Sequence, residues 1–376
     1  MKKILSIIVM LVLVTACKSQ KNQFVSIKNN NDLNYADKII SLSYTKIKRA
    51  HPWITNNAFK IINSKTLQEV PYQLEYLGNE NPQNVLIQLS VNNNEKIKLA
   101  FLKEKPTEVP PKTYGRFVPE RADDFAWEND KIAFRTYGKA LELTPKQNAY
   151  GIDVWVKRTD RMVINERYAR GKYHEDHGDG MDYYHVGYTL GAGNCAPFVK
   201  DSLWYSKNYS RHEILDNGPL RTTFRLYFDT WKVDGHMVNA TKTISLDAGS
   251  QLNKIEVSYN SETIKNLPIV IGVIKRDEVG LELFDTKNGI LGYWEPTFEK
   301  YGTTGVGVVF PLQVDDMKLR KDQYLAHLNV PTNKTFTYYT GAAWDRAGVF
   351  TTSNDWFKYL ENYKKQLNAE EFKISY

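Results

Sequence analysis

The chain has 376 residues, of which 42% are hydrophobic and 13% aromatic, and it carries a formal net charge of +7 at pH 7. A chain of this length buries enough apolar surface to hold a core without disulfide bonds, and it contains only two cysteines. Its basic residues are dispersed and form no Lys/Arg block, which argues against a nucleic-acid partner.

The N-terminus predicts export. Lys2 and Lys3 precede an apolar run from Ile4 to Val14, and Thr15-Ala16-Cys17 follows. The run is too short to span a bilayer as a helix, but it has the length of the apolar region of a signal peptide. We therefore predict a bacterial lipoprotein signal over residues 1–16.

Lipidation of Cys17 is the expected consequence, because cleavage before this cysteine exposes it for acylation. Two or more acyl chains hold a protein firmly on a membrane. Residues 17–23 are then a lipidated tether, and the protein is expected on the cell membrane, at the periplasmic or surface face of the outer membrane. Cys195 is left as the sole free cysteine, so no intramolecular disulfide is expected.

Alternating apolar and polar residues dominate the remaining chain and predict strands separated by Asn, Gly, Asp and Pro. The clear runs are Asn84–Val91, Ile132–Tyr137, Ile152–Lys157, Thr222–Phe228, Val238–Leu246, Lys254–Tyr259, Ile269–Lys275, Gly305–Phe310 and Phe336–Gly341. No strand–helix–strand alternation accompanies them. We expect an all-β fold, a large antiparallel β-sandwich.

One helix is predicted near the C-terminus, capped by Ser353 or Asn354. Its apolar residues fall on one stripe and should cover a face or an edge of the sheets; they are Trp356, Phe357, Leu360, Tyr363 and Leu367. We expect residues 24–376 to form a single catalytic domain, with a smaller leading sheet over 24–110 as the alternative.

The segment 173–198 holds the densest set of proton donors and acceptors. His174, His177 and His185 lie within it beside Tyr183 and Tyr184, and five glycines interrupt regular structure. Histidine and tyrosine are readily tuned to transfer protons, and loops on a rigid scaffold display such groups. Alternation along a strand would put Tyr183 and His185 on one face and Tyr184 on the other. A solvated loop and a metal site are the alternatives.

Arginines and tryptophans mark three further clusters, at 114–137, 292–296 and 341–348. Guanidinium groups bind carboxylates and sulfates, and aromatic faces cover sugar rings. An anionic oligosaccharide is therefore the expected partner. The candidate binding residues are Arg116, Arg121, Trp127, Arg135, Trp294, Trp344 and Arg346. Each of the tryptophans could instead be a core residue.

Four long motifs resemble a family of exported proteins of bacterial polysaccharide-utilisation loci, long carried as a domain of unknown function. They are R-F-V-P-E-R-A-D-D-F-A-W-E-N-D at 116–130, D-H-G-D-G-M-D-Y-Y-H-V-G at 176–187, L-D-N-G-P-L-R-T-T-F-R at 215–225 and L-D-A-G-S-Q-L-N-K-I-E-V at 246–257. The last two also resemble the galactose-mutarotase-like supersandwich. Within the family, the chain most resembles the oligosaccharide dehydratases of ulvan degradation.

This resemblance implies a lyase that removes water from the non-reducing-end glucuronic or iduronic acid of a sulfated oligosaccharide, leaving a 4,5-unsaturated uronyl end. Such an elimination needs a cation on the carboxylate, a base for the ring proton and an acid for the departing hydroxyl. We assign these proton transfers to His174 and Tyr184, with either as base and the other as acid, and keep His185 and His177 as further candidates.

Three alternatives stay open. A polysaccharide lyase would use the same proton abstraction but expel a sugar, and a glycan-binding lipoprotein would bind without turnover. A metal-dependent hydrolase could be built on His174, His177 and Asp176. No cofactor is implied by the motifs, so a divalent cation enters only through this last alternative.

Overall fold

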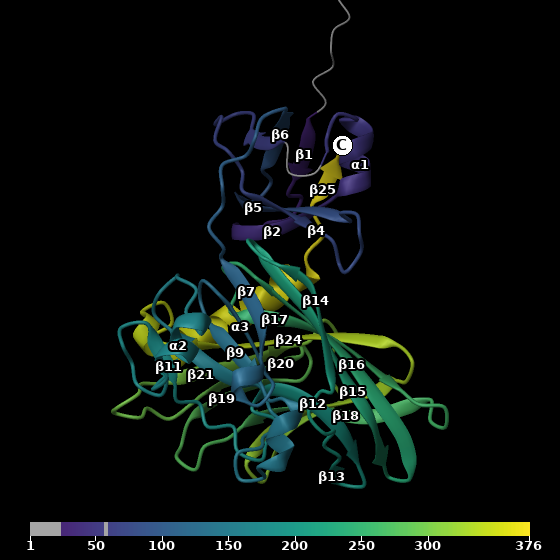
Figure 1. Cartoon of the computed structure of the whole chain (residues 1–376), viewed down its shortest axis with the longest axis vertical. Coiled ribbons are helices and arrows are strands. Elements are labelled where there is room, and N and C mark those ends of the chain that lie inside the picture. The colour runs from purple at the N-terminus through teal and green to yellow at the C-terminus, as the bar shows by residue number, and fades with distance from the viewer. Residues whose placement is uncertain (1–23, 56–58) are drawn as a thin grey trace, which may run out of the picture.

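The computed structural model describes residues 24–55 and 59–376, so the predicted signal peptide, Cys17 and the tether lie outside the described residues. Within the described part, no helix is long and apolar enough to cross a membrane. Figure 1 shows a small unit, which carries both ends of the described chain, above a larger β-sandwich.

The largest layer is an eight-stranded antiparallel sheet. In β16 buried and less buried residues alternate along most of the strand, which is the pattern of a sheet with one face on the core. In spatial order the strands are β14 (Arg211–Asn217), β15 (Arg221–Val233), β16 (His236–Asp247), β17 (Leu252–Asn260), β24 (Thr335–Trp344), β21 (Thr304–Val309), β20 (Ile290–Trp294) and β19 (Leu281–Asp285).

Two five-stranded sheets complete the sandwich. One contains β13 (Ser202–Leu203), β12 (Ala192–Val199), β18 (Asn266–Ile274), β23 (Gln323–Pro331) and β22 (Asp316–Arg320). The other, which we call the site sheet, contains β11 (Gly180–Asp182), β10 (Asp153–Lys157), β9 (Ala133–Thr136), β8 (Asp124–Asn129) and β7 (Thr113–Val118).

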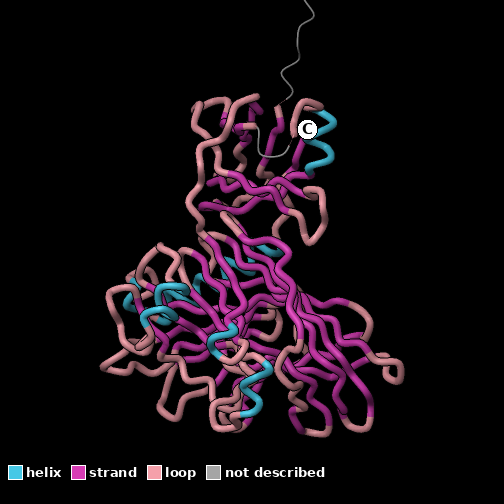
Figure 2. Tube along the Cα trace, viewed as in Figure 1, coloured by secondary structure: helices cyan, strands magenta, loops and turns pink. Residues whose placement is uncertain are grey.

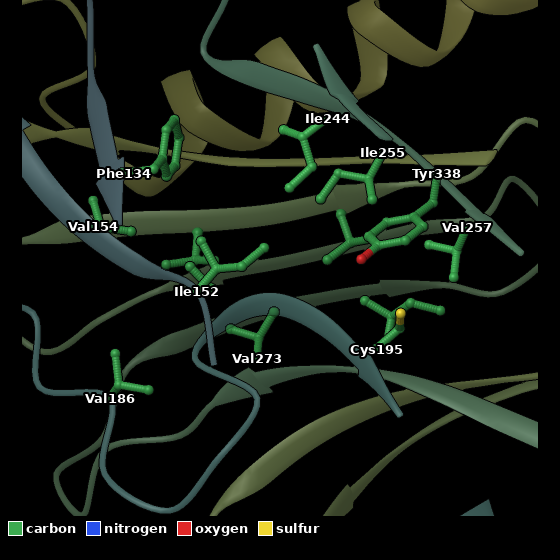
Figure 3. Packing of buried hydrophobic residues seen from close by; sticks show 14 of the residues in the cluster. Phe134, Ile152, Val154, Val186, Cys195, Ile244, Ile255, Val257, Val273 and Tyr338 are labelled. Carbon is green, nitrogen blue, oxygen red and sulfur yellow. The ribbon is translucent and has the colours of Figure 1, made fainter. Parts of the chain in front are cut away.

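A single hydrophobic cluster joins the three sheets of the sandwich. It unites Phe134 and Val154 of the site sheet with Cys195 and Val273 of the other five-stranded sheet and with Ile255 of the eight-stranded sheet. Figure 3 shows these side chains pointing toward one another between the layers. Close packing of this kind makes the core a rigid support for the loops above it.

The small unit is built from two sheets with their own hydrophobic cluster. One contains β25 (Lys373–Ser375), β1 (Val25–Lys28), β6 (Lys96–Leu102) and β3 (Lys60–Asn63), and the other contains β2 (Tyr35–Ser43), β5 (Asn84–Val91) and β4 (Tyr72–Glu75). Because β25 pairs with β1, the chain returns to this unit at its C-terminus. A single domain over residues 24–376 stays a prediction.

Helix α3 (Ser353–Asn368) is the predicted C-terminal helix, and it covers the outer face of the eight-stranded sheet. Trp356 and Leu360 are fully buried there. Gly307 permits the close approach, because a Cβ at this position would lie 2.5 Å from Leu360. The cap is Thr352 rather than the predicted Ser353 or Asn354, since Thr352 and Asp355 form a reciprocal capping box.

Short helices complete the described elements: α1 (Tyr44–Ala50), α2 (Ile164–Arg170) and the 3₁₀ turns Pro119–Arg121, Lys139–Leu143 and Asp345–Ala347. Strands dominate the tube in Figure 2, and all nine predicted strand runs coincide with observed strands. The prediction of an all-β antiparallel sandwich with a C-terminal helix is confirmed.

Candidate functional site

The histidine- and tyrosine-rich segment folds around the edge of the site sheet. Its strand β11 pairs with β10, where Asp182 stands opposite Trp155. The chain leaves the strand after Asp182, so the expected alternation of Tyr183, Tyr184 and His185 does not occur. All three line one pocket of about 300 Å³.

Cations dominate the charged lining of this pocket. Arg121, Arg135 and Lys146 line it, against the single carboxylate of Asp182. Larger clefts of about 1140 and 660 Å³ lie elsewhere, but His174, Tyr184 and His185 line neither of them. We therefore place the candidate chemistry in the smaller pocket, where cations and proton-transfer groups meet.

A buried arginine holds the base of the pocket together. Arg135 is 5% exposed, and its Nη2 lies 2.6 Å from Asp153 Oδ2 and 3.0 Å from Asp182 Oδ2. Its Nε donates to Asp153 Oδ2 at 2.9 Å, and its guanidinium lies over the ring of Trp155. Desolvating a guanidinium is costly unless carboxylates pair with it, so this three-residue cluster is a mutually dependent unit.

Burial raises the pKa of the acidic residues around Arg135. Burial raises the pKa of Asp124 to about 7, although Arg135 and Arg121 oppose the rise. Burial also raises the pKa of Asp153, with Asp182 adding to the rise, and the pKa of Asp182 itself. Burial thus favours the protonated forms of these carboxyl groups, while Arg135 favours their charged forms.

His174 is oriented by this cluster. Its Nδ1 lies 2.8 Å from the backbone oxygen of Asp182 and 3.5 Å from the carboxylate of the same residue. A carbonyl oxygen only accepts, so Nδ1 carries the proton, and Nε2 of the neutral ring is the basic nitrogen. The side chain is 68% exposed at the pocket rim. In this tautomer His174 presents an unprotonated Nε2 at an accessible position on the rim of the pocket.

Tyr184 has the opposite character. It is 2% exposed, and the Arg276 guanidinium lies over its ring at 4.6 Å. Burial, reinforced by Glu295, raises its pKa well above the usual 10. Its hydroxyl has no hydrogen-bond partner among the described residues. A buried, protonated hydroxyl without a partner can donate a hydrogen bond to a ligand in the pocket.

The hydroxyl of the neighbouring Tyr183 has a hydrogen-bond partner. The Tyr183 hydroxyl lies 2.5 Å from Thr304 Oγ1, and its ring stacks on Tyr301. Tyr183 therefore connects the loop to β21 instead of offering a free hydroxyl. Of the two tyrosines, therefore, only Tyr184 has a hydroxyl without a partner among the described residues.

The ion pair of Arg276 with Glu295 holds the loop that carries Tyr184 and His185. Arg276 Nε lies 2.7 Å from Glu295 Oε1, and its Nη1 donates to the backbone oxygen of His185 at 2.6 Å. His185 itself is exposed at the rim. Burial raises the pKa of Glu295 to about 7, with Arg276 opposing the rise. This pair positions the loop on which Tyr184 and His185 lie.

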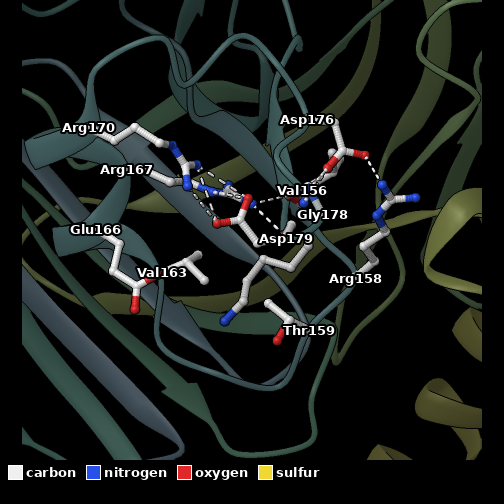
Figure 4. A network of polar contacts seen from close by, with 12 residues as sticks. Val156, Arg158, Thr159, Val163, Glu166, Arg167, Arg170, Asp176, Gly178 and Asp179 are labelled. Atoms are coloured by element: carbon white, nitrogen blue, oxygen red, sulfur yellow. Dashed lines mark hydrogen bonds and ion pairs between the residues drawn. The ribbon is translucent and has the colours of Figure 1, made fainter.

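The preceding turn is anchored by a second arginine network, shown in Figure 4. Arg167 Nη2 donates to the backbone oxygens of Val156 and Asp179, and Arg158 lies 2.7 Å from the Asp176 carboxylate. Asp176 also accepts from the backbone N–H groups of Gly178 and Gly180. Asp176 is therefore a turn-forming residue.

The three tryptophans proposed for sugar stacking lie in the core, which corrects that assignment. Trp127 is fully buried and donates to Asn253, and Trp344 is 1% exposed and donates to the backbone oxygen of Tyr301. Trp294 packs under α3. None of them lines the pocket, because each provides the large apolar surface that holds two layers together.

Three further candidates lie outside the pocket. Arg116 pairs with Glu120 at 2.5 Å, and Arg346 donates to the backbone oxygens of Glu299 and Lys300. His177 is exposed on the anchored turn. These residues are not brought together with His174, so we do not retain them as site residues.

Sequence reasoning missed Lys146, Arg276 and Glu295. Lys146 lies in the loop after a 3₁₀ turn, and Arg276 follows directly on a predicted strand. Glu295 stands next to Trp294 in the cluster at 292–296. For Arg276 and Glu295, the available sequence signal was a charged residue close to the end of a buried strand.

No group of three or more His, Cys, Asp or Glu side chains is gathered as a metal site within residues 24–55 and 59–376. His174 belongs to the pocket rim, whereas His177 and Asp176 belong to the anchored turn. The three residues therefore do not form one ligand set in this structure.

Comparison by sequence gives one family and one similar protein. The model of a family described as domain of unknown function, DUF4861, matches residues 27–370. An uncharacterized protein designated P7, from Formosa agariphila, is 31% identical over 381 residues, covering 95% of each chain.

The solved structures that are similar to this chain include two crystal structures from Enterococcus faecalis. A protein in glycosyl hydrolase family 38 has a TM-score of 0.51 at 9% identity, and an alpha-mannosidase has a TM-score of 0.52 at 10% identity. Each match covers 94% of this chain but only 47% and 46% of the respective partner, so the chain spans about half the length of these proteins. At this identity the likeness concerns the fold alone.

The anchored turn gives a prediction about stability. Gly178 and Gly180 have nearly equal φ values, +96° and +97°, but only a Cβ at Gly180 would overlap the backbone oxygen of Val156. G178A should cost about 1–3 kcal/mol of stability through backbone strain alone. G180A should cost about 1–3 kcal/mol more than G178A, because its new Cβ would overlap the backbone oxygen of Val156. Thermal unfolding of both variants tests this, and equal losses would contradict the described turn.

Proposed function

Because this chain belongs to the DUF4861 family, which carries no assigned function, its activity must be argued from its site, and we propose that it is an oligosaccharide dehydratase. The proposed reaction removes water from the non-reducing-end glucuronic or iduronic acid of ulvan-type oligosaccharides. The observation that carries the proposal is the arrangement of His174 with Nε2 as its basic nitrogen, at the rim of a pocket that holds a protonated Tyr184.

The carboxylate is bound first. The ring proton beside a carboxylate is very weakly acidic until the carboxylate charge is balanced. Arg121 is 28% exposed and Lys146 is exposed, so both cations are accessible to a ligand in the pocket. Arg135 lies beneath them and is occupied by Asp153 and Asp182. Arg121 and Lys146 therefore bind the substrate carboxylate in this proposal, and Arg135 supports the pocket.

Elimination then follows in a balanced set of transfers. His174 Nε2 takes the proton from C5, and the electron pair of that C–H bond forms the C4–C5 double bond. The C4–O bond breaks, and Tyr184 supplies the proton with which the hydroxyl leaves as water. The raised pKa of Tyr184 favours recapture of a proton from His174 through solvent. Both residues return to their starting states.

The reaction is tested by its product. The purified protein is mixed with saturated, uronic-acid-ended ulvan oligosaccharides, and ultraviolet absorbance and mass are followed. We expect a rising band with loss of one water and no chain cleavage. H174A should lower kcat by about 10²–10⁴-fold, as for loss of a general base, whereas H177A should leave it unchanged.

Other outcomes of this experiment would point elsewhere. A rising band with chain cleavage would mean a polysaccharide lyase, and a binding isotherm without any band would mean a glycan-binding lipoprotein. Equal effects of H174A and H177A would remove His174 from the proposed mechanism.

The tyrosine pair separates catalysis from stability. Y184F should lower kcat by about 10²–10⁴-fold, yet keep or raise the melting temperature, because it removes a buried hydroxyl without a partner. Y183F, which loses a hydroxyl that contacts Thr304, should affect kcat much less.

Wild-type turnover should show no loss from ionisation of Tyr184 up to pH 10, since the pKa of Tyr184 is raised well above that value. A loss of turnover on the alkaline side that begins below pH 10, without unfolding, would contradict this role of Tyr184.

We also propose that a lipid on Cys17 attaches the protein to the cell membrane. The support is the short apolar run from Ile4 to Val14 followed by Thr15-Ala16-Cys17. The C17A variant should move from the membrane fraction to the soluble fraction of cells. Retention of C17A in the membrane fraction would show that another feature holds the protein there.

A further inference from the structure

The wall of the pocket continues into an aromatic surface. Ala149 and Gly187 line the pocket, and the next residue of each segment is a tyrosine, Tyr150 and Tyr188. Tyr150 stacks on Tyr205 with ring centroids 5.3 Å apart, and the Tyr188 ring stands edge-on to both at 5.4 and 5.2 Å. We call these three residues the tyrosine bridge.

A second hollow begins where the tyrosine bridge ends. Tyr188 and Tyr205 line a cleft of about 520 Å³, together with Phe198 and Arg320. Arg320 is paired with Asp201 at 2.6 Å, and its guanidinium lies over the Phe198 ring. The bridge therefore lies between the candidate pocket and this cleft.

Tyr188 is the exposed member of the bridge. It is 66% exposed, whereas the other Phe, Trp and Tyr residues within 24–55 and 59–376 are buried or half-buried. It is nevertheless held in place, because the Tyr205 hydroxyl donates to the backbone oxygen of Tyr188 at 3.3 Å. Gln323 in turn donates to the Tyr205 hydroxyl at 3.4 Å and accepts from the backbone N–H of Leu190 at 2.7 Å. A rigid aromatic surface loses little entropy when a ligand binds to it.

The two hollows differ in charge. The pocket has three cations against one carboxylate, whereas the cleft balances Arg320 and Lys321 against Asp201 and Asp322. The cleft therefore favours hydroxyl groups and ring faces over a second carboxylate. A pocket of about 300 Å³ is at the lower end of the size range of ligand sites, so it accepts one sugar ring and leaves the rest of a chain outside.

We propose that the tyrosine bridge binds the sugar rings that follow the terminal uronate and leads the chain into the cleft. The inference deepens the proposed function and rests on it for the identity of the terminal ring. Tyrosine faces cover the apolar faces of sugar rings, so the exposed ring of Tyr188 supplies the main contact. The protein then selects oligosaccharides over single uronic acids by chain length.

The test compares two substrates and three variants. The substrates are the methyl glycoside of glucuronic acid and a uronic-acid-ended tetrasaccharide. Y188A should raise KM for the tetrasaccharide by about three- to tenfold, as for loss of one aromatic contact, with kcat unchanged and with no effect on the methyl glycoside. Y188F, which keeps the ring, should behave as wild type. L312A removes a side chain that is 79% exposed in the turn after β21, and it should also behave as wild type.

The outcomes separate this inference from the proposed function. Equal effects of Y188A on both substrates, or no effect on either, would overturn the tyrosine bridge as a binding surface. If neither substrate is turned over, the proposed function fails, and the dissociation constants of the same two ligands are measured by calorimetry. A loss of affinity confined to the tetrasaccharide in Y188A would still support the bridge, and a loss independent of length would overturn it. Unchanged melting temperatures exclude unfolding as the cause.

Discussion

The ion cluster of Arg135 with Asp153 and Asp182 is the interaction on which the candidate site depends. It joins β9, β10 and β11 side chain to side chain, with nitrogen–oxygen distances of 2.6 and 3.0 Å in an almost fully buried setting. Removing one partner of such a cluster leaves an uncompensated buried charge, which costs about 3–5 kcal/mol. Because Asp182 is fixed by Arg135, its backbone oxygen is fixed too, and this oxygen decides which nitrogen of His174 is basic. The buried charge cluster thereby determines the tautomer of His174, which is an exposed candidate for catalysis.

The rest of the molecule supplies a frame for this cluster. The site sheet packs through Phe134 and Val154 into the core shared with the eight-stranded sheet, so its edge cannot shift freely. The segment that contains β11 is held on both sides of the strand, by the arginine network around Asp179 before it and by Arg276 with Glu295 after it. Tyr184 lies between these two anchors, buried and protonated. Rigid strands thus hold groups whose chemistry belongs to a loop, which is a common arrangement of enzyme sites.

The sequence predicted the strands better than the site, for a physical reason. Alternation is a local signal, so runs such as Asn84–Val91 and Val238–Leu246 identified β5 and β16 directly. His174, Tyr184, Arg121 and Arg135 were also found, because they cluster in two short segments. The sequence could not predict the roles of the tryptophans, because a tryptophan beside an acidic residue gives the same sequence pattern in a core as on a surface. Trp127, Trp294 and Trp344 are all buried. Lys146, Arg276 and Glu295 come from distant segments that only the tertiary fold brings to the loop.

The central claim is that the pocket beside His174 and Tyr184 receives a uronate end. A crystal structure of H174A with a bound, saturated uronic-acid-ended trisaccharide tests this claim most directly, because it shows ligand and pocket together. The claim predicts the terminal carboxylate on Arg121 and Lys146, with C5 facing the space left by the His174 ring and the following ring on Tyr188. An ordered sugar in one of the larger clefts, lined by Tyr76 or by Tyr339, with the pocket beside Tyr184 empty, would contradict it.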